Sequence, residues 1–536
     1  MPDEQSAVLA GNLAALASSN PSLAALIAKS VPSAAFLFRR ARDGSMVPSV
    51  RTRSGEIRLH SLIDPRKEAQ RLLQSIGAPG YLACFGMGGG FSAEAFLRQR
   101  QAAGLLIIEK DASILRALLG NLDLSTVLKD QRTQLTVGTG EIRSIVRSRY
   151  LPAVCGDFSS LPLRPWFEAE EDFFGRAAHE LSRAADEARA DYAVQARFGK
   201  RWFANTILNL PAAQTASLAR VHGQLAHVTA AGPSLEDDLE ELAERDDGGI
   251  IVATDTSLPA LQRFGVTPDV VVSIDCQLYT YHHFLMSGSP KVIQFFDLAS
   301  PPFLVRRAET RARFFTSAHP LSRYAAARWR RFPVVDTTGG NVTHAAVSLA
   351  RALGVSSVRV HGADFSYPGA KPYARGTYLY DFFQEHQQRC LPLESSLVTL
   401  VLGSAGLTRV PADSGVRFST LTLLDYQERL KNLIEDISGS EADPIEESPA
   451  QISWQEFLAG YAESIRALPL PSSPLGGYFS GLPGEQRGLW ATLLPITARI
   501  LREAGGKADR AESLDAARLW ALERVDRMLT DWPQEP

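Results

Sequence analysis

The stretch that decides the fold is LAHVTAAGPSLEDDLEELAERDDGGIIVATDTSLPALQRFGVTPDVVVSID, residues 225–275. Its short apolar runs alternate with amphipathic segments, a pattern that predicts strand, glycine turn, helix, strand, helix and strand. The turn is Gly232-Pro233-Ser234, and an acidic helix starts directly behind it. Glycine permits a tight turn, proline suits a first helical turn, and serine caps a helix. Free N–H groups at a helix N-terminus attract anions, so we expect a nucleotide phosphate there.

A second glycine turn occurs in DTTGGNVTHAAVSLARALGVSSVRVHGADFSY, residues 336–367, where it leads into a helix rich in alanine and leucine. A strand is predicted to follow at 357–361. Strands that alternate with helices imply a mostly parallel sheet, and ligands bind at the carboxyl ends of such strands. Asp255, Asp275 and Asp364 stand at predicted strand ends, so we expect them to converge with both turns at one site. The alternative is that these acids merely cap helices.

The N-terminal part contains a further glycine turn in YLACFGMGGGFSAEAFLRQRQAAGLLIIEK, residues 81–110. Short helices in the first 30 residues and a small β-meander from about residue 34 are predicted to precede it. The pattern resembles the first half of a class I, S-adenosylmethionine-dependent methyltransferase-like domain. That resemblance implies that Gly86 and Gly88 lie against the cofactor and that Glu109 holds its ribose. Because no later catalytic motif follows, we expect a degenerate, structural domain and no S-adenosylmethionine binding.

Composition limits the classes of function. The chain has 536 residues, of which 45% are hydrophobic and 21% charged, and its net charge is −3. This balance gives no general attraction to nucleic acid or anionic lipid. Four widely spaced cysteines, without a CxxC pair, argue against a zinc site and against a disulfide framework. The N-terminus carries acids where a signal peptide needs bases, and no stretch approaches ~20 apolar residues, so we expect a cytoplasmic protein without membrane insertion.

These features together predict an α/β, multidomain protein with Rossmann-like parallel sheets and a helical C-terminal region. The expected parts are a β-meander with the methyltransferase-like domain at 1–150, a helical connector, most simply a helix pair, at 151–210, a central domain at 211–420 and a helical domain at 421–536. Within the central domain, the tyrosine- and glycine-rich stretch 368–386 is expected to be a lid or substrate loop.

Three segments of the central domain carry a family resemblance: AAGPSLEDDLEEL, IVATDTSLPALQRFGVTPDVVVSID and TTGGNVTHAAVSLARALGVSSVRVHGADFSY. Together they resemble the core of the motility-associated-factor (Maf) glycosyltransferases, also described as similar to an archaeal 6-hydroxymethylpterin diphosphokinase (MptE-like). The same core is similar in pattern to bacterial sialyltransferases, and the resemblance covers roughly residues 200–435. It implies transfer of a nonulosonic, sialic-acid-like sugar from a CMP-activated donor to Ser or Thr of flagellin, in support of flagellum assembly and motility.

The resemblance also assigns residues to the donor site. Arginine and tyrosine suit charge-assisted hydrogen bonds with a phosphate or a sugar carboxylate. The residues implied to bind the nucleotide or donor are Gly232, Pro233, Ser234, Asp255, Thr338, Gly339, Gly340, Asn341, Asp364, Tyr373, Arg375 and Tyr378. Asp275-Cys276-Gln277 is not an Asp-X-Asp pair, so we expect no obligatory metal and no cofactor beyond the donor substrate.

Sugar transfer further needs a base that takes the proton of the acceptor hydroxyl. Asp275, His319 and His344 are the expected candidates, because they lie nearest the two turns and the strand ends. The other histidines considered are His282, His283 and His386.

Two alternatives to this function stay open. One is a catalytically silent scaffold that binds flagellin. The other is a 6-hydroxymethylpterin diphosphokinase-like phosphotransferase, which is disfavoured because SIDCQLYTYHHFL, residues 273–285, stands where that family pattern needs an aspartate and histidine cluster for Mg-ATP. The particular sugar, the acceptor sites and the oligomeric state are left open by the sequence.

Overall fold

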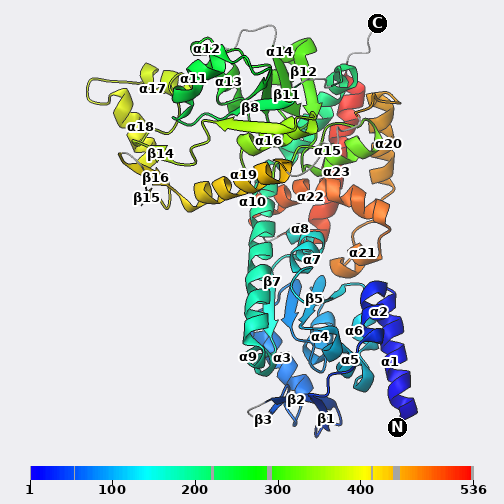
Figure 1. The fold of residues 1–536 in the computed structure, drawn as a ribbon. Coiled ribbons are helices and arrows are strands. Elements are labelled where there is room, and N and C mark those ends of the chain that lie inside the picture. The colour runs from blue at the N-terminus through cyan, green and yellow to red at the C-terminus, as the bar shows by residue number, and fades with distance from the viewer. Residues whose placement is uncertain are drawn as a thin grey trace. The chain divides into compact units, whose positions relative to one another are not determined.

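The computed structural model divides the chain into two compact units, each of which is described by itself (Figure 1). The residues that the structure describes are 2–52, 55–218, 223–285, 292–411, 415–438, 447–506 and 508–532. Unit 1 comprises Met1–Gly199, Leu468–Trp490 and Leu494–Leu519, and unit 2 comprises Lys200–Ala467, Ala491–Leu493 and Trp520–Pro536.

Unit 1 is built on a four-stranded parallel sheet with the strand order β6-β5-β4-β7. Its central strands are buried along their whole length, as expected for parallel strands covered on both faces. The strands are β4 (Tyr81–Phe85), β5 (Gly104–Glu109), β6 (Thr133–Val137) and β7 (Phe158–Pro162). The helices around them are α3 (Pro65–Ser75), α4 (Phe91–Leu97), α5 (Ala112–Asn121), α6 (Ser125–Lys129), α7 (Ile142–Arg149), α8 (Pro152–Cys155) and α9 (Arg164–Ala169).

Two helices and a small antiparallel sheet precede this domain, as the sequence predicts. They are α1 (Pro2–Ala17), α2 (Pro21–Lys29), β1 (Phe36–Arg40), β2 (Met46–Thr52) and β3 (Gly55–Arg58). The side-chain amide of Asn12 on α1 donates to the carbonyl groups of Leu119 and Leu122 at 2.8 Å and 2.7 Å. This buried asparagine ties α1 to the end of α5.

The connector at 151–210 differs from the expected helix pair. It holds β7, which pairs with β4 and completes the first sheet, and then most of one helix, α10 (Glu171–Thr215), of 45 residues. Phe174, Leu181 and Ala184 are buried on α10 at helical spacing. No residue in 186–195 is buried, but this stretch holds no proline or glycine to end the helix where a pair would need a turn.

Unit 2 is built on a six-stranded parallel sheet with the strand order β12-β11-β10-β9-β8-β13. The chain moves outward from β8 to β12 and then returns to place β13 on the other side of β8. The strands are β8 (Leu225–Thr229), β9 (Ile250–Thr254), β10 (Val270–Ser273), β11 (Ile293–Asp297), β12 (Ala312–Phe315) and β13 (Ser357–His361). The order reverses between β8 and β13, and such a switch point is where open α/β sheets bind ligands.

Helix α16 (Val342–Ala352) forms the centre of the unit 2 core. Its Ala345, Ala346, Leu349 and Ala350 are fully buried in the same cluster as the apolar residues of β8, β9 and β10. Small side chains let this helix lie close to the sheet. The remaining helices between the strands are α11 (Leu235–Glu244), α12 (Leu258–Arg263), α13 (Tyr281–Phe284), α14 (Pro302–Ala308) and α15 (Pro320–Arg328).

An appendage follows β13. It contains α17 (Tyr378–Glu385), α18 (Leu393–Leu402) and a three-stranded sheet with the order β14-β16-β15. These strands are β14 (Tyr367–Pro368), β15 (Thr408–Val410) and β16 (Arg417–Ser419). Part of the predicted lid stretch, 368–386, is therefore helical, and its loop is confined to the residues before α17.

The C-terminal helices do not form one separate unit at 421–536. Leu430 and Ile437 of α19 (Leu421–Ser438) belong to the core of the unit 2 sheet, and α20 (Trp454–Arg466) also lies in unit 2. Helix α21 (Leu475–Gly481) lies in unit 1, whereas α22 (Gly484–Glu503) and α23 (Arg510–Asp531) contribute residues to both units. Among the helices of the described residues, none has the length and apolar character to cross a membrane.

Candidate functional site

Hydrogen bonds between two turns close the switch point of the unit 2 sheet. The N–H of Gly232, after β8, donates to the carbonyl of Gly362, after β13, at 2.8 Å. The N–H of Ser234 donates to Oδ2 of Asp364 at 3.0 Å. A Cβ on Gly232 would lie 2.2 Å from Oδ2 of Asp364 and 2.5 Å from the carbonyl oxygen of Gly362. The first glycine turn therefore needs glycine because Asp364 lies against it.

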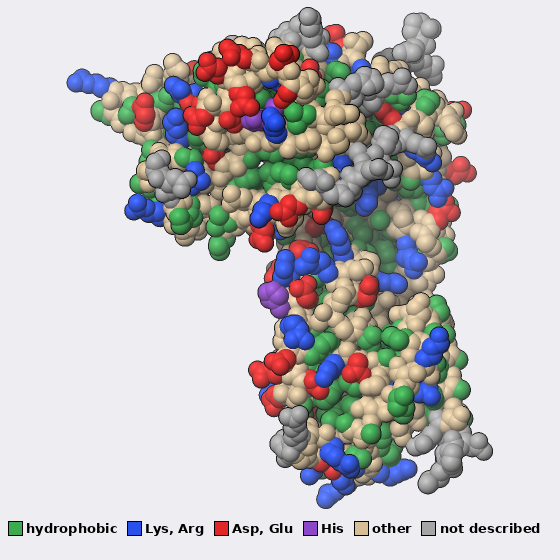
Figure 2. All heavy atoms as spheres, viewed as in Figure 1, with side chains coloured by type: hydrophobic (Ala, Val, Ile, Leu, Met, Phe, Trp, Pro, Cys, Tyr) green, Lys and Arg blue, Asp and Glu red, His purple; other side chains and the backbone are tan. Residues whose placement is uncertain are grey.

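The carboxylate of Asp364 takes the place that an anion would occupy at the N-terminus of α11. The next N–H groups, those of Leu235, Glu236 and Asp237, already donate to carbonyls of the same turn. Helix α11 adds a run of acids, LEDDLEELAE, and acidic side chains gather on the surface over it (Figure 2). The negative charge disfavours the phosphate expected here, and the geometry instead favours a ligand hydroxyl that donates to Asp364.

The second glycine turn is organised around His344, in the first turn of α16. The side-chain oxygen of Asn341 accepts from the N–H of His344 at 3.1 Å and lies 2.9 Å from its Nδ1. A Cβ on Gly339 would lie 2.2 Å from the His344 ring. Burial lowers the pKa of His344, and the ring contacts Phe365, the residue after Asp364, at 6.3 Å between centroids. His344 thus connects the second turn to the turn that carries Asp364.

The outer residues of the second turn have structural partners. The N–H of Thr338 donates to Oδ1 of Asp336 at 2.8 Å, and the carbonyl of Thr338 accepts from Arg429 at 3.1 Å. Gly340 has a φ of +82°, and a Cβ there would lie 2.6 Å from the ring of Tyr426. The left-handed backbone and the nearby ring both require glycine at this position.

Asp255 follows β9 and is almost fully buried. The hydroxyl of Ser273 donates to its Oδ2 at 2.8 Å, and that of Thr256 donates to its Oδ1 at 3.1 Å. Burial raises the pKa of Asp255, and the charge of nearby His283 on α13 opposes that effect. Burial in turn lowers the pKa of His283. The end of β9 and helix α13 therefore bring together a buried carboxyl group and a partly buried imidazole.

Tyrosine and histidine rings surround His283. The Tyr378 ring lies edge-on to His283 at 4.8 Å and stacks on His282 at 5.7 Å, and its hydroxyl forms a hydrogen bond with Tyr279. Burial raises the pKa of Tyr373 and of Tyr378, so both phenols stay protonated and can donate hydrogen bonds. We call this group the aromatic–histidine cluster, defined as Asp255, Tyr279, His282, His283, Tyr373 and Tyr378.

The loop before α17 runs beside the first turn. The N–H of Ala374 donates to the carbonyl of Ala231 at 2.9 Å, which holds the loop against the end of β8. Arg375 points elsewhere: its Nε lies 2.6 Å from Glu236, and its side chain is 63% exposed. Tyr373 and Tyr378 therefore join the cluster, whereas Arg375 is occupied by an ion pair.

The remaining catalytic candidates lie apart from the second turn. Asp275 accepts from the N–H of Gln277 at 2.9 Å, and its charge acts on His283. His319 stacks on Trp202 at 4.2 Å, and its Nε2 lies 3.9 Å from Oδ1 of Asp297 at the end of β11. Asp275 thus borders the aromatic–histidine cluster, and His319 belongs to a separate group at β11 and β12. Within the described ranges, no three potential ligands among His, Cys, Asp and Glu gather as a metal site.

Side chains of the chain itself fill the glycine turn of unit 1. A Cβ on Gly86 would lie 2.7 Å from the ring of Trp166, and one on Gly88 would lie 2.5 Å from Nε2 of His60. The N–H of Gly89 donates to that same His60 nitrogen at 2.9 Å. The space beside the turn, where a cofactor would lie, is therefore taken by an indole and an imidazole.

Glu109, which the methyltransferase resemblance implies as a ribose ligand, is fully buried. Its carboxylate accepts from Nε1 of Trp166 at 2.9 Å and from the N–H groups of Met87 at 3.1 Å and Lys110 at 3.0 Å. Burial raises the pKa of Glu109, although the hydrogen bonds from these donors act in the opposite direction. Both carboxylate oxygens already have internal donors, so the residues present do not fit S-adenosylmethionine.

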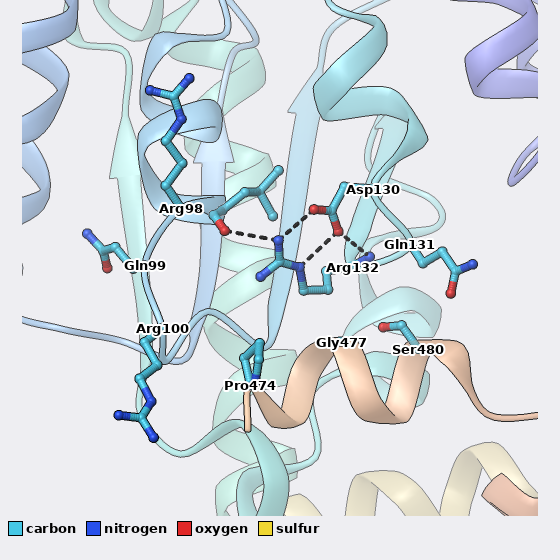
Figure 3. A pocket seen from close by; sticks show the side chains of 10 residues that line it. Arg98, Gln99, Arg100, Asp130, Gln131, Arg132, Pro474, Gly477 and Ser480 are labelled. Atoms are coloured by element: carbon cyan, nitrogen blue, oxygen red, sulfur yellow. Dashed lines mark hydrogen bonds and ion pairs between the residues drawn. The ribbon is translucent and has the colours of Figure 1, made fainter. Parts of the chain in front are cut away.

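A hollow of about 500 Å³ opens in unit 1 beside α21 (Figure 3). The guanidinium of Arg132 lies in it and bonds to Asp130 at 2.6 Å and to the carbonyl of Leu97 at 2.9 Å. In Figure 3 the side chains of Arg98 and Arg100 extend away from Arg132. Because the Arg132 guanidinium is already paired with Asp130 and Leu97, this hollow is a weaker candidate for a ligand site than the strand ends of unit 2.

Some members of the site carry no signal of their own in the sequence. Ser273 and Tyr279 are not among the predicted site residues, and His283 is one of several candidate histidines. One signal is YTYHHF, residues 279–284, which sets five aromatic or imidazole rings in the segment between β10 and β11. Such a run at the carboxyl end of a parallel strand indicates a ligand site.

Comparisons with known proteins bear on the family and the fold. The family described as 6-hydroxymethylpterin diphosphokinase MptE-like matches residues 204–370. An uncharacterized protein of Treponema pallidum (strain Nichols) is 32% identical over 169 residues, which cover 30% of this chain and 79% of that protein. A second uncharacterized protein of the same organism is 34% identical over 146 residues, which cover 25% of this chain and 52% of the relative.

Among solved structures, the MAf glycosyltransferase from Magnetospirillum magneticum AMB-1 matches 98% of this chain and 96% of its own, with a TM-score of 0.60 and 15% identity. The chain is therefore an α/β protein with the fold of a Maf glycosyltransferase. The chain belongs to the MptE-like family, as its relatives and the matched central residues show. The expected fold class and the resemblance to Maf and MptE-like proteins are confirmed.

Proposed function

We propose that the protein is a glycosyltransferase that moves a nonulosonic sugar from a CMP-activated donor to a Ser or Thr hydroxyl of flagellin. The observation that carries the proposal is the aromatic–histidine cluster beside the switch point, where acceptors, donors and an imidazole gather at the ends of parallel strands. The fold shared with the MAf glycosyltransferase supports the reaction class. CMP, the sugar and flagellin come from the family resemblance.

The donor nucleoside is matched by the carboxylate of Asp364 at the Gly232 turn, an acceptor that suits a ribose hydroxyl. Asp255, after β9, is buried and its two carboxylate oxygens already accept from Ser273 and Thr256, so in this proposal it does not contact the ribose. The phosphate then lies toward the hydroxyl groups of Tyr279 and Tyr378 rather than at the N-terminus of α11. Hydroxyl groups aimed at a leaving phosphate stabilise the charge that develops on it.

The base in this proposal is His283. Its Nδ1 is buried without a hydrogen-bond partner among the described residues, and its lowered pKa keeps the ring neutral at neutral pH. The acceptor hydroxyl gives its proton to Nδ1 while its oxygen bonds to the anomeric carbon. The bond from that carbon to the phosphate oxygen breaks, and its electron pair leaves with CMP. The carboxyl group of Asp255 stabilises the imidazolium that forms.

The test combines binding with transfer. In a thermal-shift panel, we expect CMP and CDP to stabilise the wild-type protein more than ATP does, and Asp364→Asn to lose that stabilisation. In a transfer assay with flagellin and a CMP-nonulosonic acid, we expect His283→Gln to lower the rate by about 10²–10⁴-fold. The matched control His319→Gln should keep most of the rate.

Three outcomes would overturn the proposal. Stabilisation by ATP and not by cytidine nucleotides would favour a phosphotransferase. Normal flagellin glycosylation and motility in cells that carry Asp364→Asn and His283→Gln would favour a scaffold. A loss of transfer in His319→Gln, with His283→Gln unaffected, would move the base to the ends of β11 and β12.

A further inference from the structure

Two buried histidines beneath α11 form a continuous hydrogen-bonded chain with two aspartates. Nδ1 of His227, on β8, lies 3.0 Å from Nε2 of His361, on β13. Nε2 of His227 lies 2.9 Å from Oδ2 of Asp247, and Nδ1 of His361 lies 3.0 Å from Oδ2 of Asp238. The rings are 1% and 7% exposed, so water does not substitute for these contacts. The order along the chain is Asp247, His227, His361, Asp238.

The number of protons in this chain follows from its geometry. Each of the three contacts has hydrogen-bond length, and each needs one proton between its two atoms. The pKa of Asp247 is held low by the Gly249 N–H and by His227, so its carboxylate supplies no proton, and the carboxylate of Asp238 is the acceptor at the other end of the chain. Two neutral imidazoles carry only two protons. Without a third proton, two lone pairs would face each other at about 3 Å in one of the three contacts.

We propose that His227 and His361 share one proton, so that the pair carries a single positive charge between the carboxylates of Asp238 and Asp247. The pair then clamps α11 to the sheet: Asp238 lies on α11, and Asp247 lies between α11 and β9. Charge-assisted hydrogen bonds of this kind are about twice as strong as neutral ones.

The charged groups around the pair are consistent with one shared proton. From β13, Arg359 lies 3.8 Å from Asp247 and adds positive charge on the outer side of that carboxylate. From the end of α11, Arg245 is directed to Asp269 at 3.3 Å and to the carbonyl of Gly249. A second proton on the histidine pair would place two adjacent positive rings at 5.2 Å between centroids, and like charges so close repel.

The clamp is a positioning device for the candidate site. Helix α11 begins at the turn that bonds to Asp364, and His361 directly precedes the Gly362–Asp364 turn on β13. Both sides of the switch point are therefore attached to the same proton-sharing pair. These hydrogen bonds do not depend on the proposed transferase activity.

Nitrogen-15 NMR of ring-labelled histidine tests the proton count. At neutral pH we expect a far-downfield proton resonance from the shared N–H–N bond, and outer ring nitrogens that are both protonated. His227→Gln and His361→Gln assign the signals, because each should remove the shared resonance. Two neutral rings with an unprotonated contact between them would overturn the proposal.

Hydrogen exchange measured by mass spectrometry tests the clamp. We expect amides of α11 to exchange about tenfold faster in His361→Gln, and His386→Gln, an exposed histidine of the same unit, to leave them unchanged. Raising the pH until the shared resonance disappears should also loosen α11 in the wild type after correction for intrinsic rates, with no such step in His361→Gln. Unchanged exchange in the folded variant, or an equal pH step in both proteins, would overturn the clamp.

Discussion

Gly232→Ala is the most direct test of the switch-point geometry. The added Cβ would lie 2.2 Å from Oδ2 of Asp364 and 2.5 Å from the carbonyl oxygen of Gly362, so the Asp364 side chain must move. Overpacking of this kind costs about 1–3 kcal/mol. The displaced carboxylate also loses its hydrogen bond from the Ser234 N–H, and a bond to a charged group contributes about 1.5–3 kcal/mol. We expect the free energy of unfolding of unit 2 to fall by about 3 kcal/mol or more.

The assay is a thermal unfolding scan with and without CMP. For a domain of this size, about 3 kcal/mol corresponds to a fall in Tm of roughly 6 °C or more. Gly460→Ala is the matched control, because Gly460 lies on α20 with nothing within 4 Å of its added Cβ. Alanine there favours the helix, so its Tm should be unchanged or slightly higher. A Gly232→Ala protein that unfolds like the wild type, and that CMP stabilises equally, would refute the proposed packing of Asp364 against the turn.

Two further predictions concern pH and the unit 1 turn. Burial lowers the pKa of His283, so the transfer rate should fall only as the pH drops below about 6.5, and His283→Gln should remove this acid dependence. Unit 2 should also become less stable below that pH, because His283 binds a proton in the unfolded chain that the folded chain excludes. S-adenosylmethionine should not raise the Tm, and a rise would contradict the conclusion that Trp166 and His60 fill the site. Gly88→Ala should lower the Tm, because Gly88 has a φ of +51° and its added Cβ would lie against His60.

Much of the fold could be predicted because the relevant signals are local. The apolar runs at 81–85 and 105–108 became buried parallel strands, since a strand covered on both faces is mostly apolar. The boundary at 150 did not anticipate β7, a short strand that is only partly buried and carries little signal. The C-terminal helices were assigned to one domain because helical spacing reveals an apolar face and not the partner that covers it.

The candidate site was predicted in part. The two glycine turns and the acids at strand ends can be located from the sequence, because glycine at a strand-to-helix turn and an acid after a strand are local patterns. The partners of those groups did not follow. From the sequence, Arg375 is expected to bind an anion, whereas in the structure it forms an ion pair with Glu236. The two residues are 139 positions apart, so no local sequence pattern predicts this contact.

The sequence by itself determined that the chain alternates strands and helices, that Gly232-Pro233-Ser234 starts α11, and that the central region belongs with Maf and MptE-like proteins. Only the tertiary structure decided what the turn faces. Because β13 lies beside β8, Asp364 accepts from the Ser234 N–H at the turn where the sequence predicts a phosphate, and His361 lies next to His227. Strand order is set by packing of the whole sheet, so neither contact can be read from local pattern.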